Sequence, residues 1–251
     1  MRKCLYYSEN DVGPVRVWEE KNTRWLTISD SRIQSIINMD MLHQIILPHL
    51  NPMLASLQIS AKRKKDILIL GLGGGAMIHF IRKFYPDDKI TVVEIDPTII
   101  HIAKEFFYIG TKRDDIKIIQ GDAFSVLNNN PHQYDIIIVD LTVIDIEEHI
   151  SLHQASYNVL SKEGLCIINS ACFNTTDAET VLSSFSAVFK RQCLSIPVKG
   201  TQNLISSGWI NPENALTIFD LVKEGCLSLE SNADTKYGLI ASRFSPLLDT
   251  E

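Results

Sequence analysis

Five short runs of apolar, mostly β-branched residues alternate with stretches of helical periodicity, and this alternation constrains the fold more than any other feature of the 251-residue chain. The runs are Ile67–Leu70, Ile90–Glu94, Ile116–Ile119, Ile136–Val139 and Leu165–Ile168. Such runs are typical of parallel strands that are buried on both faces. The pattern therefore predicts an α/β fold with a doubly wound, mostly parallel sheet and right-handed crossovers.

Capping signals place several of the intervening helices. Asp96-Pro97 supplies an N-cap residue and a first-turn proline, and Thr176 with Glu179 fits a capping box. Beyond them, a last helix is predicted from Asn211-Pro212 to Gly225, followed by a strand over Tyr237–Arg243.

A small antiparallel β unit is predicted ahead of this sheet. Its strands are Lys3–Tyr7, Val15–Glu19 and Arg24–Ile28, separated by turn-forming residues. We therefore divide the chain into an N-terminal β unit over 1–38 and a nucleoside-binding catalytic domain over 39–251. An apolar stripe over Leu42–Leu57 has helical spacing, and its two prolines predict a kink or two shorter helices.

Composition excludes several classes of protein. The chain is 45% hydrophobic and 22% charged, so it is not a disordered or low-complexity chain, and it has no apolar stretch of membrane-spanning length. Its five cysteines form no C-x-x-C pair and no signal peptide is evident, so we expect a cytoplasmic protein without a membrane partner. The net charge of −6 argues against a nucleic-acid partner.

A glycine loop between the first predicted parallel strand and a helix is the strongest local motif. Four of five consecutive residues are glycine, namely Gly71, Gly73, Gly74 and Gly75. Glycines allow a sharp turn and close approach to a ligand, and the amides at the helix N-terminus then face that ligand. The spacing also satisfies the dinucleotide fingerprint G-x-G-x-x-A.

Acidic residues end the next three strands. Glu94 can bind both ribose hydroxyls of a nucleoside, as in both nicotinamide-dinucleotide and adenosyl-sulfonium sites. Asp122, before Ala123, can accept a proton from an adenine amino group or cap the following helix. Asp140 ends the fourth strand across the switch point from the glycine loop. A crevice with three carboxylates favours an adenosyl-sulfonium ligand.

In this order, the motifs resemble those of the polyamine aminopropyltransferases of polyamine biosynthesis, of which spermidine synthase is the best known. That family has the Rossmann-like sheet of class I S-adenosylmethionine-dependent methyltransferases after a small N-terminal β unit. The segments that carry the resemblance are Arg32–Ile37, Leu70–Gly75, Val92–Asp96, Gly121–Phe124 and Tyr134–Asp140. The resemblance covers nearly the whole chain, in its spermidine-synthase-like branch, and implies a homodimer or homotetramer. It gives nucleoside-binding roles to Gln34, Gly71, Gly73, Gly74, Glu94, Asp122 and Ala123, and a catalytic role to Asp140.

Three positions depart from the family pattern. Gly74 and Val143 stand where the family has Asp, and the segment Ile196–Gly200 lacks the family's Tyr. Loss of the Asp at position 74 removes a partner of the aminopropyl ammonium and a repulsion toward a carboxylate. It therefore favours S-adenosylmethionine, methylthioadenosine or a related nucleoside as the ligand, over decarboxylated S-adenosylmethionine.

Three functions follow from the resemblance and its departures. The first is aminopropyl transfer from a decarboxylated S-adenosylmethionine-type donor to a small amine at an altered polyamine site, with Asp140 orienting the amine and accepting its proton. The others are methyl transfer from S-adenosylmethionine, and nucleoside binding without catalysis. His149 and His153 have the spacing of metal ligands without a third partner, so we expect no metal.

Overall fold

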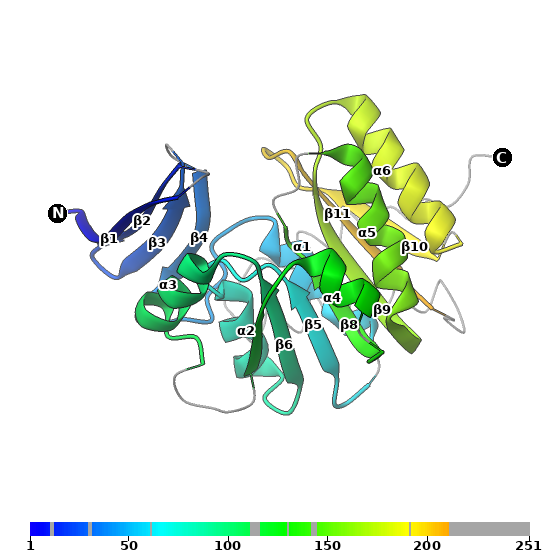
Figure 1. The fold of residues 1–251 in the computed structure, drawn as a ribbon, viewed down its shortest axis with the longest axis horizontal. Helices are drawn as coiled ribbons and strands as arrows, with labels where there is room; N and C mark the ends of the chain where they lie inside the picture. Colours follow the sequence, from blue (N-terminus) through cyan, green and yellow to red (C-terminus); the bar gives the residue numbers. More distant parts are fainter. Residues whose placement is uncertain are drawn as a thin grey trace.

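The structure is a computed structural model of the chain, and it describes residues 1–10, 13–29, 32–60, 62–110, 116–129, 131–141, 145–190 and 192–210. A four-stranded sheet and a seven-stranded sheet lie side by side in it (Figure 1). Val143, the predicted helix from Asn211-Pro212 and the predicted strand Tyr237–Arg243 lie outside the described residues.

The seven-stranded sheet confirms the predicted α/β class. Its strands are β5 (Asp66–Leu70), β6 (Lys89–Glu94), β7 (Ile116–Gln120), β8 (Tyr134–Val139), β9 (Leu160–Ala171), β10 (Cys193–Pro197) and β11 (Asn203–Trp209). They lie in the order β10-β11-β9-β8-β5-β6-β7. The five predicted strands are parallel to one another, and only β11 runs antiparallel to both of its neighbours. Since β5 pairs with β6 on one side and β8 on the other, the topological switch point lies at the end of β5.

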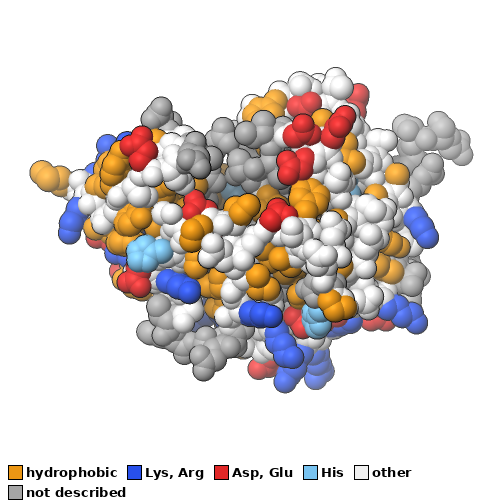
Figure 2. Space-filling model, viewed as in Figure 1, with side chains coloured by type: hydrophobic (Ala, Val, Ile, Leu, Met, Phe, Trp, Pro, Cys, Tyr) orange, Lys and Arg blue, Asp and Glu red, His pale blue; other side chains and the backbone are white. Residues whose placement is uncertain are grey.

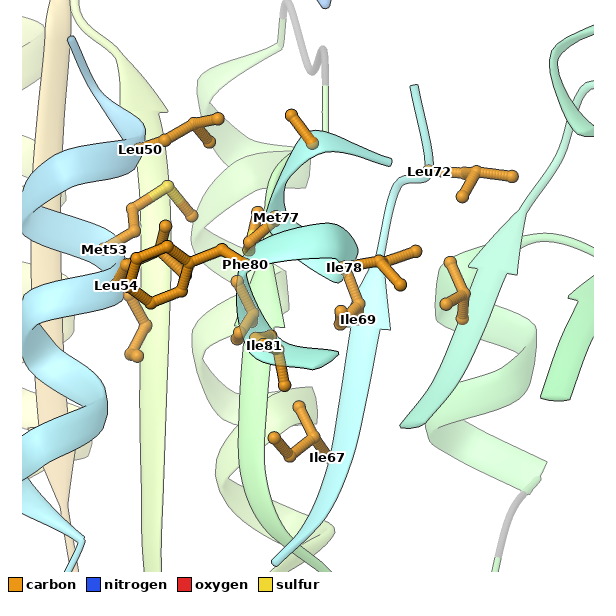
Figure 3. Packing of buried hydrophobic residues seen from close by; sticks show 14 of the residues in the cluster. Leu50, Met53, Leu54, Ile67, Ile69, Leu72, Met77, Ile78, Phe80 and Ile81 are labelled. Carbon is orange, nitrogen blue, oxygen red and sulfur yellow. The ribbon is translucent and has the colours of Figure 1, made fainter. Parts of the chain in front are cut away.

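Helices cover both faces of this sheet because alternate residues of each strand point to opposite sides. Ile67 and Ile69 of β5 belong to one core cluster, whereas Leu68 and Leu70 belong to another. The first cluster packs against α1 (Leu50–Ala55), the 3-10 helix η1 (Ser56–Ile59), α2 (Ala76–Phe84) and α3 (Pro97–Phe107); Figure 3 shows α1 and α2 side chains meeting β5. The second packs against α4 (Ala123–Asn129), α5 (Ile146–Asn158) and α6 (Thr175–Val188).

The N-terminal sheet is antiparallel, as predicted, and has one strand more than expected. Its strands are β1 (Lys3–Asn10), β2 (Gly13–Glu20), β3 (Thr23–Ile28) and β4 (Arg32–Asn38). Two hydrogen bonds tie it to α3: Asn10 Nδ2 donates to Asp96 Oδ2 at 2.9 Å, and Arg24 donates to the Phe106 carbonyl at 2.6 Å. This contact places β4 beside the glycine loop.

Two of the local predictions need correction. The helix expected within Leu42–Leu57 begins only at Leu50, because a proline at position 48 disfavours helical geometry at the residue before it. The N-cap of α6 is Asn174, whose side chain accepts the N–H of Asp177 at 2.9 Å, so Thr176 is already inside the helix. The predicted cap at Asp96 is confirmed, since its side chain accepts the N–H of Thr98 at 2.7 Å.

No helix in the described part of the chain combines the length and the apolar character that crossing a membrane requires.

Candidate functional site

A cavity of about 620 Å³ opens where the carboxyl ends of the parallel strands meet. Its lining comes from the ends of β5, β6 and β9, from the residues that follow β7 and β8, from the glycine loop and from β4. Ligands of doubly wound sheets bind at this edge, next to the switch point. Of the predicted site residues, Gln34, Gly71, Gly73, Glu94, Asp122, Ala123 and Asp140 line this one cavity.

The glycine loop has the backbone geometry that its sequence predicts. Gly71, Gly73 and Gly75 have φ values of 97°, 51° and 73°, in the region that favours glycine. A Cβ on Gly71 would also collide with the carbonyl oxygen of Asp140. The first glycine therefore lets the end of β5 pass closely beside the end of β8, and Gly75 is the N-cap residue of α2.

Gly74 lies differently from the other loop glycines. It is buried, it is absent from the cavity lining, and a Cβ built on it would come within 2.8–2.9 Å of Ser35 and Phe107. A side chain at position 74 would therefore point toward β4 and α3. Among the predicted site residues, Gly74 is the one that does not line the cavity.

Glu94 holds the glycine loop as well as facing the cavity. Its carboxylate accepts the N–H of Leu72 and the N–H of Asp96, each at 3.0 Å. The side chain is half-buried and lies at the end of β6. A carboxylate has about four lone-pair directions, so two remain for hydroxyl donors of a ligand.

Asp122 combines the two roles that its sequence context left open. Its Oδ1 accepts the N–H of Ser125 at 2.8 Å, as a helix-capping residue does, and its exposed side chain also lines the cavity. Beside it, Ala123 and Phe124 line the same wall, and Ile95 contributes an apolar side chain that is 65% exposed. An acid next to apolar surface suits a heterocyclic base with an exocyclic amino group.

Asp140 belongs to a chain of polar side chains that the sequence analysis did not identify. Its Oδ1 accepts from Asn169 Nδ2 at 2.8 Å, and Asn169 Oδ1 accepts from Asn203 Nδ2 at 2.9 Å. Its Oδ2 lies 3.9 Å from Nε2 of His49. All four residues line the cavity. A polar residue directly after an apolar run was the available signal for Asn169, whereas no spacing pattern marks His49.

Gln34 and Ser35 approach the cavity from the N-terminal sheet. Both lie on β4 and line the cavity, with Ser35 buried and Gln34 partly exposed. The backbone carbonyl of Gln34 lies 3.7 Å from the position that a Cβ on Gly73 would take. The N-terminal sheet therefore contributes one wall of the cavity.

The charged groups of the cavity have one sign. Five carboxylates line it, those of Glu94, Asp96, Asp122, Asp140 and Glu148, and no Lys or Arg is among its described lining residues. On the face shown in Figure 2, acidic side chains gather near the upper middle, and Lys and Arg lie mainly along the lower edge and the sides. Carboxylates on concave walls attract cationic ligands.

His149 and His153 lie away from the cavity, buried between α5 and its neighbours. Each contacts a serine hydroxyl: His149 Nε2 lies 2.6 Å from Ser170 Oγ, and His153 Nδ1 lies 3.1 Å from Ser184 Oγ. Burial lowers the pKa of His149 to about 4 and that of His153 to about 3. In the part of the chain that the structure describes, no three His, Cys, Asp or Glu residues form a cluster able to hold a metal.

Comparisons with known proteins identify the family. The family model described as "Spermine/spermidine synthase domain" matches residues 49–207. The polyamine aminopropyltransferase of Neisseria meningitidis serogroup A is 26% identical over 194 residues, which are 76% of this chain and 73% of that protein. The eEF1A lysine and N-terminal methyltransferase of Danio rerio is 31% identical over 155 residues, 54% of this chain but only 22% of that protein.

A solved structure shows the same fold. Spermidine synthase from Thermotoga maritima superposes with a TM-score of 0.70 at 14% identity, over 96% of this chain and 84% of that one. At this identity the likeness shows a shared fold. The match of the family model extends over more than half of the sequence, and the chain belongs to the spermine/spermidine synthase family.

Proposed function

We propose that this chain transfers an aminopropyl group from decarboxylated S-adenosylmethionine to an amine. The observation that carries the proposal is the cavity's set of five carboxylates without a lysine or arginine among its described lining residues. The donor carries a sulfonium and an ammonium, and the acceptor arrives as an ammonium. A concave surface of opposite sign concentrates both substrates.

The nucleoside half of the donor matches one wall of the cavity. Glu94 has lone pairs for the ribose hydroxyls, and Asp122 lies where it can accept from an adenine amino group. Ile95 and Phe124 offer apolar surface to the base, while Gln34 lines the cavity from β4. These residues support an adenosine ligand and are shared by any donor of the S-adenosylmethionine type.

The decarboxylated donor is favoured because the intact donor carries a carboxylate that would need partners in the cavity. S-adenosylmethionine has a carboxylate, which needs hydrogen-bond donors or a cation in an acid-lined cavity. Three amides of the glycine loop already donate elsewhere: Gly71 to Val93 O, Leu72 to Glu94, and Gly75 to Leu72 O. Gly74 is not among the cavity-lining residues and a Cβ there would meet Ser35 and Phe107, so its lack of an Asp is a weak reason to prefer the intact compound.

The reaction is an in-line displacement at the carbon beside the sulfonium. An alkyl ammonium has a pKa of about 10.4, so the acceptor must lose a proton before its nitrogen can attack. A carbon–nitrogen bond then forms and the carbon–sulfur bond breaks, with its electron pair going to sulfur. Asp140 is suited to orient the amine, since Asn169 holds one of its oxygens and the other faces the cavity.

A second candidate is methyl transfer from S-adenosylmethionine to an amine. It is favoured by the likeness to the eEF1A lysine and N-terminal methyltransferase, whose name also specifies amine acceptors. The two candidates share the sulfonium nucleoside and the nucleophilic nitrogen, and they differ in the group transferred.

Calorimetric titration with S-adenosylmethionine, its decarboxylated form and methylthioadenosine tests the proposal. We expect the decarboxylated donor to bind at least about tenfold more tightly than the intact one, a difference of about 1.4 kcal/mol. Mass spectrometry after incubation with amines should then show an added aminopropyl group. Tighter binding of the intact donor with methylated products would instead establish the second candidate. Nucleoside binding without any product would make the chain a non-catalytic homologue.

A further inference from the structure

We infer that His49 is the group that takes the proton from the acceptor amine, paired with an Asp140 carboxylate that Asn169 and Asn203 hold in place. The inference rests on the proposed function, because it assigns the acceptor side of the same cavity. It begins with the two oxygens of Asp140, which have different surroundings: Asn169 donates to Oδ1 at 2.8 Å, whereas Oδ2 lies 3.9 Å from His49 Nε2.

The amide chain behind Asp140 has only one consistent orientation. An ionised carboxylate only accepts hydrogen bonds, so Asn169 must turn its NH₂ group toward Asp140. Its carbonyl oxygen then faces Asn203, which donates to it at 2.9 Å. Asn169 is 9% exposed, so neighbouring atoms restrict its rotation. Oδ1 is thereby occupied, and Oδ2 remains for the cavity side.

His49 reaches this oxygen from a rigid support. It is the N-cap residue of α1, and its side chain makes no capping hydrogen bond. Leu50, Met53 and Leu54 anchor the helix, each 4% exposed or less. The imidazole is 18% exposed and lines the cavity, so it is both positioned and accessible to a ligand.

The separation between the two groups suits an inserted nitrogen. A distance of 3.9 Å is too long for a direct hydrogen bond. One amine nitrogen can lie about 2.9 Å from both Oδ2 and Nε2, the usual hydrogen-bond length. Asp140 would then accept one N–H of the bound ammonium, and neutral His49 would accept another.

With His49 and Asp140 taking part, every proton of the transfer has a donor and an acceptor. The acceptor ammonium gives one proton to Nε2 of neutral His49, which becomes an imidazolium beside ionised Asp140. The free amine attacks the carbon next to sulfur, the carbon–sulfur bond breaks, and the products are a thioether and a secondary ammonium. After release of the products, His49 returns its proton to water. Histidine suits this role because it changes charge near neutral pH.

Substitution of His49 tests the inference, with His43→Gln as the matched control. His43 lies in the same segment before α1, packs on the ring of Phe84 and is not among the cavity-lining residues. We expect His49→Gln to bind decarboxylated S-adenosylmethionine within about threefold of the wild type and to lower the rate of transfer to 1,4-diaminobutane, spermidine or n-butylamine at least about 100-fold. His43→Gln should keep both values.

The pH dependence of kcat/KM distinguishes a His49 that accepts a proton from a His49 that has only a structural role. The wild-type rate should fall as the pH decreases below neutral, and His49→Gln should lose this acidic limb. The other titratable groups that line the same cavity are the carboxylates of Glu94, Asp96, Asp122 and Glu148.

The outcomes distinguish this inference from the proposed function. Absence of nucleoside binding by the wild type overturns the proposed function, and the inference with it. Normal nucleoside binding together with wild-type transfer by His49→Gln, or with an unchanged acidic limb, overturns the inference alone. Tight binding of the donor without wild-type transfer to any of the three amines overturns both, because the chain would then be a non-catalytic homologue.

Discussion

At the scale of single residues, Glu94 joins loop structure to ligand recognition, because its carboxylate accepts from the loop at Leu72 and faces the cavity. In Glu94→Gln, one acceptor oxygen becomes an NH₂ group that meets the N–H of Leu72 or of Asp96. We expect nucleoside affinity to fall about 10- to 100-fold, in line with about 1.5–3 kcal/mol for a charged hydrogen bond, as calorimetry would measure. Glu105→Gln, an exposed position on α3, should leave the affinity unchanged. Equal affinities of the two variants would show that Glu94 does not contact the ligand.

At the scale of elements, the packing of α6 on β11 depends on the absence of a side chain at Gly208, where a Cβ would overlap the ring of Phe189 just after α6. Gly208→Ala should lower the free energy of unfolding by about 1–3 kcal/mol, because this core is already filled. In thermal unfolding, each kcal/mol corresponds to about 2–4 °C for a chain of this size. Phe189→Leu makes room for the methyl group, so the double variant should lose less stability than the two single losses added together. Simple additivity would mean that the two residues do not share this contact.

At the scale of the whole molecule, buried His149 and His153 make stability depend on pH. The pKa values of both lie far below the unfolded value of about 6.5, at about 4 and about 3, because burial disfavours the charged ring. Between about pH 6.5 and pH 4 the unfolded chain therefore binds more protons than the folded one, and stability falls as the pH falls. The variant His149→Gln/His153→Gln should show a shallower decrease of Tm over this range. A slope equal to that of the wild type would mean that other groups cause the acid sensitivity.

The sequence predicted the parts of the molecule that depend on chain periodicity. Apolar runs fix buried parallel strands, and the carboxyl ends of such strands converge, so Glu94, Asp122 and Asp140 could be brought to one cavity without side-chain detail. The rest depends on three-dimensional contacts. His49 and Asn203 come from segments without a motif, and the closeness of Gly74 to Ser35 and Phe107 exists only in the folded chain. The residues that contact the ligand and the division at residue 38 remain predictions.

One wall of the cavity is contributed by β4, which carries Gln34 and Ser35 and precedes the segment matched by the family model at residue 49. The cavity is thus lined both by strand ends of the seven-stranded sheet and by a strand of the N-terminal sheet. Replacing the N-terminal sheet would therefore change one wall of the cavity and leave the acids at the strand ends where they are. Swapping the first 38 residues between relatives would reveal how much of the substrate choice depends on this wall.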